Sequence, residues 1–206
     1  GNTGPVTVQI QGGKLAEDAT YELVDSLGTA VTATSVFWVD SSTAYATFNL
    51  DGHATGAYDV RVGGAGSPAA LSDALTVIVG IPGKVGLNLS TPNAVRVGRS
   101  GNVVVDYVNS GNTDVIAPLL QVSVNVGSLV LPNGEGQTAQ FLGIAESGPA
   151  GVLSPGAHGT VTFTYRAPSS ASTTDVGLSL VADGTSAIDW NSFRDAMRPP
   201  SVPVDA

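Results

Sequence analysis

Three side chains in one short loop, Asn109, Asn112 and Asp114, form the densest group of loop oxygen ligands in the sequence. Calcium binds several amide, carbonyl and carboxylate oxygens that lie close together. This spacing therefore predicts a calcium site, although no Asp-x-Asp-x-Asp loop accompanies it. The same residue types also cap turns and keep loops solvated, and this second interpretation is the more frequent use of such residues.

Trp38 is the candidate for ligand binding, because exposed aromatic rings stack on the faces of sugars. It follows Phe37, and neighbouring side chains of a strand point to opposite faces. If Phe37 fills the core, Trp38 is exposed and offers a platform for a glycan. The interpretation that we favour is that Trp38 itself fills the core, or lies under a loop or against a neighbouring module.

The two histidines, His53 and His158, are the residues on which a hydrolytic triad would depend. Each stands beside a glycine in an expected turn, and the sequence contains no Gly-x-Ser-x-Gly nucleophile motif. A Ser-His-Asp triad needs a nucleophile and an acid on either side of the imidazole. We therefore predict that the chain is not an enzyme, and we assign no catalytic residue.

The composition limits the classes of partner. A chain of 206 residues suits two domains of about 100 residues, and 42% apolar against 12% charged residues favours folding over disorder. The net charge of −9 repels nucleic acids and anionic lipids. No apolar run approaches the roughly 20 residues of a membrane helix. Without cysteine, disulfides and thiolate metal sites are excluded.

The first 81 residues read as one β-sandwich. Short runs with alternating apolar and polar side chains, separated by Gly, Ser, Asp or Asn, predict strands at 5–10, 19–25, 31–39, 44–50, 58–62 and 71–79. Tyr58 stands at the start of one of these runs, after the turn residues Asp51 and Gly52. This position resembles the tyrosine corner of Greek-key sandwiches, in which the hydroxyl bonds back to the preceding crossover.

A short linker, residues 81–84, precedes a second sandwich over residues 84–183. Its sequence Ile-Pro-Gly-Lys combines a residue that cannot donate to a strand ladder with one that permits a sharp turn. Alternation predicts strands at 85–89, 102–108, 119–126, 128–131, 141–144, 159–165 and 174–181. Residues 184–206 form a Pro-rich tail in which Trp190, Phe193 and Met197 have the spacing of a short amphipathic helix. The expected fold is all-β: two tandem immunoglobulin-like antiparallel β-sandwiches with a short C-terminal helix.

Motifs in the second module resemble a known family. The run Val103 to Asp114, ending Val-Asn-Ser-Gly-Asn-Thr-Asp, the turn Leu153-Ser-Pro-Gly and the strand Thr160-Val-Thr-Phe-Thr-Tyr are similar to the cell-adhesion-related domain found in bacteria (CARDB-like) over residues 84–183. The first module, with Gly-x-Tyr-Asp-Val-x-Val from Gly56 to Val62, is similar to immunoglobulin-like repeats beside such domains. The resemblance implies a spacer or adhesion segment of a mosaic extracellular protein, and it carries over no catalytic residue.

The predicted function is therefore a noncatalytic structural spacer or adhesion segment of a large bacterial secreted or cell-surface multidomain protein. We expect a monomer whose partners are the neighbouring domains, with a glycan or protein surface as a further ligand. Calcium is the one cofactor that the sequence offers, and nucleic-acid binding and membrane insertion are not expected. The alternative is an accessory carbohydrate- or protein-binding module of a secreted hydrolase.

Overall fold

The computed structural model describes residues 1–63, 69–116 and 118–182, and in these residues the chain is all-β and built from antiparallel sheets. The predicted tail helix around Trp190 lies outside the described residues. The chain divides into two compact units. Among the described residues, the first consists of Gly1–Lys84 with the loops Asn109–Val115 and Ala145–Ala157, and the second contains Val85–Val108, Ile116–Ile144 and residues 158–182. The sequence boundaries place both loops in the second module.

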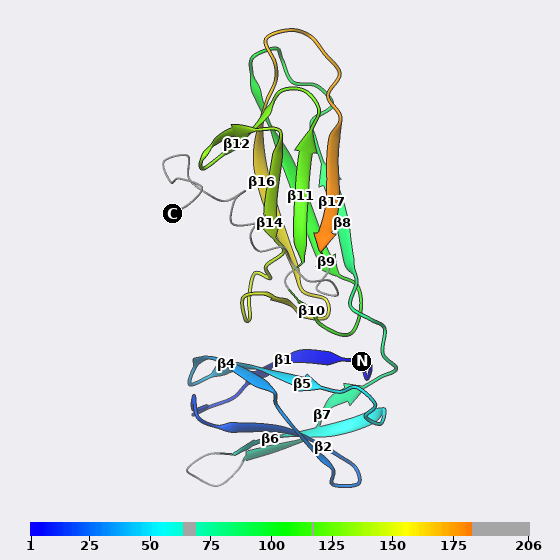
Figure 1. The fold of residues 1–206 in the computed structure, drawn as a ribbon. Coiled ribbons are helices and arrows are strands. Elements are labelled where there is room, and N and C mark those ends of the chain that lie inside the picture. Colours follow the sequence, from blue (N-terminus) through cyan, green and yellow to red (C-terminus); the bar gives the residue numbers. More distant parts are fainter. Residues whose placement is uncertain (64–68, 117, 183–206) are drawn as a thin grey trace, which may run out of the picture. The chain divides into compact units, whose positions relative to one another are not determined.

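The first unit consists of two sheets, which Figure 1 shows as separate layers. The three-stranded sheet has the order β1 (Pro5–Gln11), β5 (Thr43–Asn49), β4 (Ser35–Asp40). The four-stranded sheet has the order β3 (Ala30–Thr32), β2 (Thr20–Asp25), β6 (Gly56–Gly63), β7 (Ala69–Val77). Buried side chains of both sheets, among them Phe48 and Leu23, form one core cluster. The alternation seen in the sequence therefore buries one face of each sheet.

The predicted strand at 31–39 is wrong as a single element. The chain forms β3, leaves it at Ala33 and Thr34, and enters β4 in the other sheet. The backbone N–H of Ala33 donates to Tyr21 O in the four-stranded sheet, at 2.9 Å. The N–H of Thr34 donates to Thr47 O in the three-stranded sheet, at 2.7 Å. One peptide unit thus carries the chain from sheet to sheet, which alternation alone does not reveal.

The tyrosine corner predicted at Tyr58 is confirmed. Its hydroxyl donates to Ala54 O, four residues earlier, at 2.9 Å, and the ring is buried in the core. Residue 54 lies on the connection between β5 and β6, which belong to different sheets. The bond therefore fixes the crossover against the core that both sheets share.

The second unit contains a three-stranded and a five-stranded sheet. One has the order β14 (Thr138–Leu142), β11 (Leu119–Val124), β17 (Val176–Ala182). The other has the order β13 (Gly134–Gly136), β12 (Ser128–Leu131), β16 (His158–Arg166), β9 (Ser100–Asn109), β8 (Val85–Ser90). The two-residue strands β10 (Val115–Ile116) and β15 (Val152–Leu153) pair with each other, and Val115 and both residues of β15 belong to the first unit. Fully buried side chains such as Val105 in β9 and Leu120 in β11 come from both the five-stranded and the three-stranded sheet.

Tyr107 anchors the connection that follows β14 in the second unit. Its hydroxyl donates to Ile144 O at 2.7 Å and accepts from Ile144 N at 3.1 Å. Residue 159 faces this hydroxyl, and a Cβ atom there would lie 2.4 Å from it. Glycine is therefore required at position 159, because any side chain would displace the ring from its anchor.

Candidate functional site

The loop 109–114, predicted as a calcium site, is organised around the buried amide of Asn109. Its Nδ2 donates to Thr113 O and Leu153 O, both at 2.8 Å. Its Oδ1 accepts from Lys84 N at 3.2 Å and Gly111 N at 3.0 Å. A primary amide offers two donors and two acceptor lone pairs, so the bonding capacity of Asn109 is fully used.

The same loop holds the linker between the two predicted modules. Asn112 accepts from Ile81 N at 2.6 Å through Oδ1 and donates to Val79 O at 2.9 Å through Nδ2. Thr113 Oγ1 accepts from Gly83 N at 2.8 Å. Together with the bond from Lys84 N to Asn109, these contacts engage the backbone from 79 to 84 at successive positions. The linker is therefore part of the first unit and not a free tether.

Asp114 covers the edge of strand β1. Its carboxylate accepts from Thr7 N at 2.9 Å and from Thr7 Oγ1 at 2.7 Å, and its own backbone N–H donates to Pro5 O at 2.8 Å. Burial raises the pKa of the Asp114 carboxyl above its ordinary value, and the two hydrogen bonds from Thr7 oppose that rise. Asp114 thus satisfies backbone groups that the outer strand of the sheet would otherwise leave unpaired.

These contacts favour turn capping over calcium binding at the loop. A cation would have to displace the bonds that Asn109, Asn112 and Asp114 make within the first unit. No group of three or more His, Cys, Asp or Glu side chains suited to a metal ion occurs among residues 1–63, 69–116 and 118–182. The prediction of calcium stays untested, but the oxygens on which it rests already have partners.

Trp38 lies on β4 and faces the core side of its sheet. It pairs with Ala44, which is fully buried, whereas Phe37 pairs with Tyr45 on the opposite face. Its indole N–H donates to Leu15 O at 3.2 Å. The side chain is nevertheless 36% exposed, so the prediction that Trp38 binds a ligand stays untested. The aromatic pair on the outer face is Phe37 and Tyr45, with ring centroids 6.3 Å apart.

The two histidines do not share a unit. His53 belongs to the first unit and His158 to the second. In the described part of the chain neither imidazole makes a hydrogen bond or an ion pair with another side chain. Neither ring therefore has the orienting carboxylate or the hydroxyl nucleophile that a triad requires.

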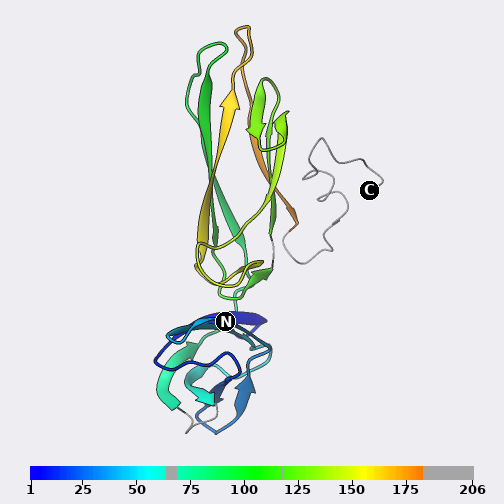
Figure 2. The same cartoon turned by 90° about the vertical axis from the view of Figure 1, so that its left-hand side faces the viewer.

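A cavity of about 380 Å³ opens between two loops at one end of the second unit. Both views show these loops, 91–99 and 167–175, side by side (Figure 2). They are joined by bonds from Gly98 N to Pro168 O and from Ala167 N to Arg99 O, both at 2.9 Å. The cavity is lined mainly by aliphatic and hydroxyl-bearing residues: Thr91, Pro92, Asn93, Ala94, Val95, Val97, Val103, Tyr165, Ala167, Pro168, Ser170, Ala171, Ser172, Thr173, Thr174 and Val176. Sequence reasoning missed this site.

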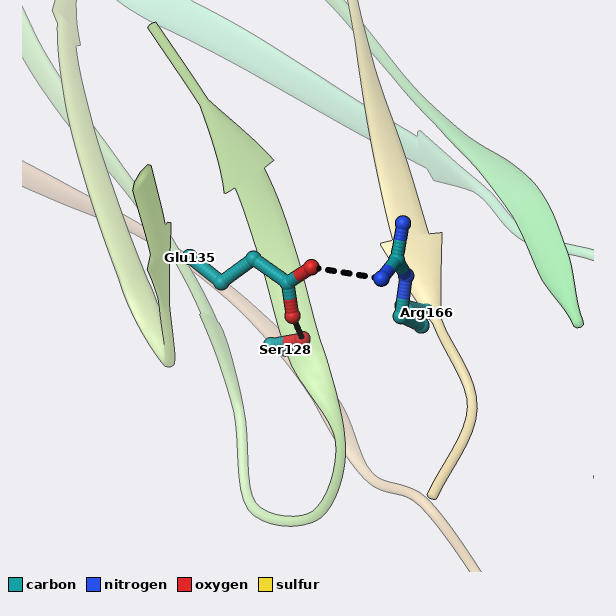
Figure 3. Close-up of polar contacts among 3 residues, drawn as sticks. All are labelled: Ser128, Glu135 and Arg166. Atoms are coloured by element: carbon teal, nitrogen blue, oxygen red, sulfur yellow. Dashed lines mark hydrogen bonds and ion pairs between the residues drawn. The ribbon is translucent and has the colours of Figure 1, made fainter. Parts of the chain in front are cut away.

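A polar cluster on the second unit involves Ser128, Glu135 and Arg166 (Figure 3). The guanidinium Nη1 of Arg166 lies 2.9 Å from Glu135 Oε1, and Ser128 Oγ donates to Glu135 Oε2 at 2.6 Å. Both charged side chains are about half exposed. An ion pair of this kind contributes about 0–1 kcal/mol, so the cluster attaches β13 to β12 and β16 and offers no reactive group.

The comparisons with known proteins establish no family for the chain. No protein-family model matches the chain, and no curated protein matches it. Among solved structures the chain is similar to an alpha-2-macroglobulin of Salmonella, with 18% identity and a TM-score of 0.28. The match covers 88% of this chain but 13% of that protein. A TM-score of this size does not establish a common fold. In the described residues no helix is long and apolar enough to cross a bilayer.

Proposed function

We propose that the chain is a noncatalytic spacer in a large bacterial secreted or cell-surface protein, built from two immunoglobulin-like sandwiches that connect neighbouring domains. The observation that carries this proposal is the hydrogen-bonded linker. Its backbone is bound at Val79, Ile81, Gly83 and Lys84 by the loop 109–114. A spacer needs such a linker, because a linker without these bonds would sample many end-to-end distances.

The uses of the polar side chains support the same proposal. In the loop 109–114 the side chains of Asn109, Asn112, Thr113 and Asp114 all bind linker or strand backbone. The absence of cysteine leaves backbone pairing and apolar packing to resist extension. Adhesion, the other half of the proposed role, additionally requires a surface that binds a partner.

Amide hydrogen exchange of the intact chain, followed by NMR, tests the spacer. We expect the amides of Ile81, Gly83 and Lys84 to be protected as strongly as those of the outer strands. Asn112→Ala should remove protection at Ile81, because that amide loses its acceptor. Asn93→Ala is the matched control, since Asn93 lies in a loop of the second unit and its amide has no hydrogen bond within the described residues. Linker amides that exchange like those of an unfolded peptide would refute the spacer.

The cavity of the second unit favours a second candidate, an accessory binding module. The hydroxyls of Ser170, Ser172 and Thr173 line it without a hydrogen bond to any described residue. Tyr165 is its one titratable lining side chain, and the phenol is bonded to Thr174 at 2.7 Å. Such a lining suits an uncharged, hydroxyl-rich ligand, because a buried charge without a partner is costly.

Titration of the chain with cellobiose, followed by NMR, tests this second candidate. We expect shifts at the amides of Ser172 and Thr173 and weaker ones with glucuronate, which carries a charge. Ser172→Ala should weaken the response, whereas Ser41→Ala in the first unit should leave it unchanged. An unchanged spectrum at 20 mM cellobiose would eliminate the sugar-binding version of this candidate.

A further inference from the structure

Strand β4 exposes an unusual run of apolar side chains. Val36, Phe37, Trp38 and Val39 are 37%, 45%, 36% and 47% exposed, and they are consecutive in the sequence. Consecutive residues of a strand point to alternate faces, so both faces of β4 are apolar. A strand of this kind is normally buried on both sides. Here β4 is an outer strand of a three-stranded sheet whose Ala44 side adjoins the core cluster. On the other side of the sheet Tyr45 is buried too, and Gly148 lies next to its ring, but the β4 side chains themselves stay exposed.

The backbone of β4 is also open on one side. Among the described residues β4 pairs with β5 and with no other strand. Outer strands are usually protected by charged side chains, proline or a covering loop, because unpaired N–H and C=O groups recruit other strands. The opposite outer strand, β1, has such protection: Pro5 begins it and Asp114 binds its backbone. On β4 the one irregularity is a bulge between Trp38 and Asp40.

The charge of the first unit indicates which kind of strand would bind. The unit carries ten acidic and three basic side chains. A second copy of the chain would bring the same excess of negative charge, and long-range repulsion disfavours that pairing. The exposed carboxylate of Asp40 stands at the end of β4 and accepts from Ser42 N at 2.7 Å. A cationic partner is therefore favoured over a second copy.

We propose that the open side of β4 binds an extended, cationic segment of another polypeptide, which adds a fourth strand to this sheet. Backbone hydrogen bonds supply the pairing, and alternate apolar side chains of the partner contact Phe37 on one face and Val36 and Trp38 on the other. A lysine or arginine of the partner meets Asp40. Trp38 is already held by its bond to Leu15 O, so little ordering of the indole accompanies binding.

The test uses a synthetic ten-residue peptide in which valine and threonine alternate and lysine stands at both ends. Added to the isotopically labelled intact chain, it should shift the amides of β4 and β5 and slow hydrogen exchange along β4. The same peptide with glutamate at both ends should bind at least tenfold more weakly. Equal affinity of the two peptides would overturn the charge argument, and no response in β4 at 1 mM peptide would overturn the proposal.

Matched variants separate the site from the rest of the sheet. Phe37→Lys places a charge on the exposed face of β4 and should abolish binding, and Phe37→Thr, which adds no charge, should weaken it about tenfold. Gln9→Lys places the same charge on exposed Gln9 of β1, at the other side of the same sheet, and should leave binding unchanged. Loss of binding in Gln9→Lys would contradict the assignment. So would a dimer of the chain alone in sedimentation that Phe37→Lys dissociates, because the occupant would then be a second copy.

Discussion

The two outer strands of the three-stranded sheet differ in how they meet their surroundings. At β1, Asp114 binds Thr7 and Pro5, so the backbone that β5 does not use has a partner. At β4, the corresponding side has no strand partner in the described chain, and its side chains are large and apolar. The side chains of loop 109–114, predicted as a calcium site, are used in hydrogen bonds within the first unit. The apolar side chains of β4 remain partly exposed. The two outer strands therefore differ in whether their outward backbone groups have hydrogen-bond partners, and the residue types alone do not show this.

The largest loss of stability is expected on mutation of Asn109, around which the loop 109–114 is organised. Asn109→Ala leaves two backbone carbonyls and two N–H groups without their side-chain partner in a buried position. Each unsatisfied buried group costs about 1 kcal/mol or more, and relaxation recovers part of that, so we expect a loss of about 3 kcal/mol. Urea unfolding followed by fluorescence measures it. A loss below 1 kcal/mol would show that the loop does not support the first unit.

Asp114→Ala opens the protected side of β1 directly. The backbone N–H of the buried Thr7 loses its acceptor, while the Thr7 hydroxyl keeps Thr47 at 2.8 Å. We expect a loss of about 2 kcal/mol and faster exchange at the Thr7 amide. If that amide stays protected, Asp114 is not what covers β1, and the comparison between the two strands fails.

Two buried tyrosines, Tyr58 and Tyr21, differ in whether the hydroxyl has a hydrogen-bond partner among the described residues. Tyr58→Phe removes a hydroxyl that is bonded to Ala54 and should destabilise the unit by about 1 kcal/mol. Tyr21→Phe removes a buried hydroxyl that has no partner in the described chain, so it should be neutral or stabilising by up to about 1 kcal/mol. Thermal unfolding of both variants distinguishes them. Equal destabilisation would count against the argument.

The dependence of stability on pH gives a smaller, signed effect. Because burial raises the folded-state pKa of Asp114 above 3.8, its ionisation destabilises the folded state, and this penalty grows as the pH rises from 3.8 through the folded pKa. Asp114→Asn lacks the penalty. The free energy of unfolding of the variant minus that of the natural chain should therefore increase over this window and then stay constant.

Asp40→Asn is the control for that measurement. Hydrogen bonds from Ser42 lower the pKa of Asp40 in the folded state, so its ionisation is stabilising and the same difference should decrease as the pH rises. Acid titration of the unfolding free energy gives both slopes. Slopes of the same sign would show that the environment of Asp114 is not as described.

The smallest effect is expected on the open side. Val39→Thr keeps the shape of an exposed side chain at the bulge of β4 and should change stability by less than about 0.5 kcal/mol. A loss above 1.5 kcal/mol would mean that β4 is already packed against something in the folded chain.

Much of the fold could be predicted from the sequence, because alternation marks most long strands and the motif around Tyr58 marks the crossover. The switch of sheet at Ala33 and Thr34 could not, since it depends on partners outside the run. Strands β10, β13 and β15 have two or three residues, which is too short for a period to show.

The candidate sites were harder to predict than the fold. The partners of Asn109 lie at Lys84 and Leu153, far away in the sequence, so nothing in the loop itself shows that its amide is occupied. The sequence does carry a signal for the exposed strand β4, because four consecutive large apolar residues do not fit a strand with one buried face. The cavity depends on the approach of two loops, which spacing does not encode.

The dependence of β1 on Asp114 has a consequence for the order in which the chain is made. Strands β1 to β7 are complete by Val77, but the residue that covers β1 is added only about 30 residues after the linker ends. From Val77 to Asp114, synthesis at about 5–20 residues per second leaves that backbone without its partner for about 2–7 seconds. During biosynthesis both outer strands of the three-stranded sheet, β1 and β4, therefore have unpaired backbone groups at first. Once Asp114 has been added, only β4 does.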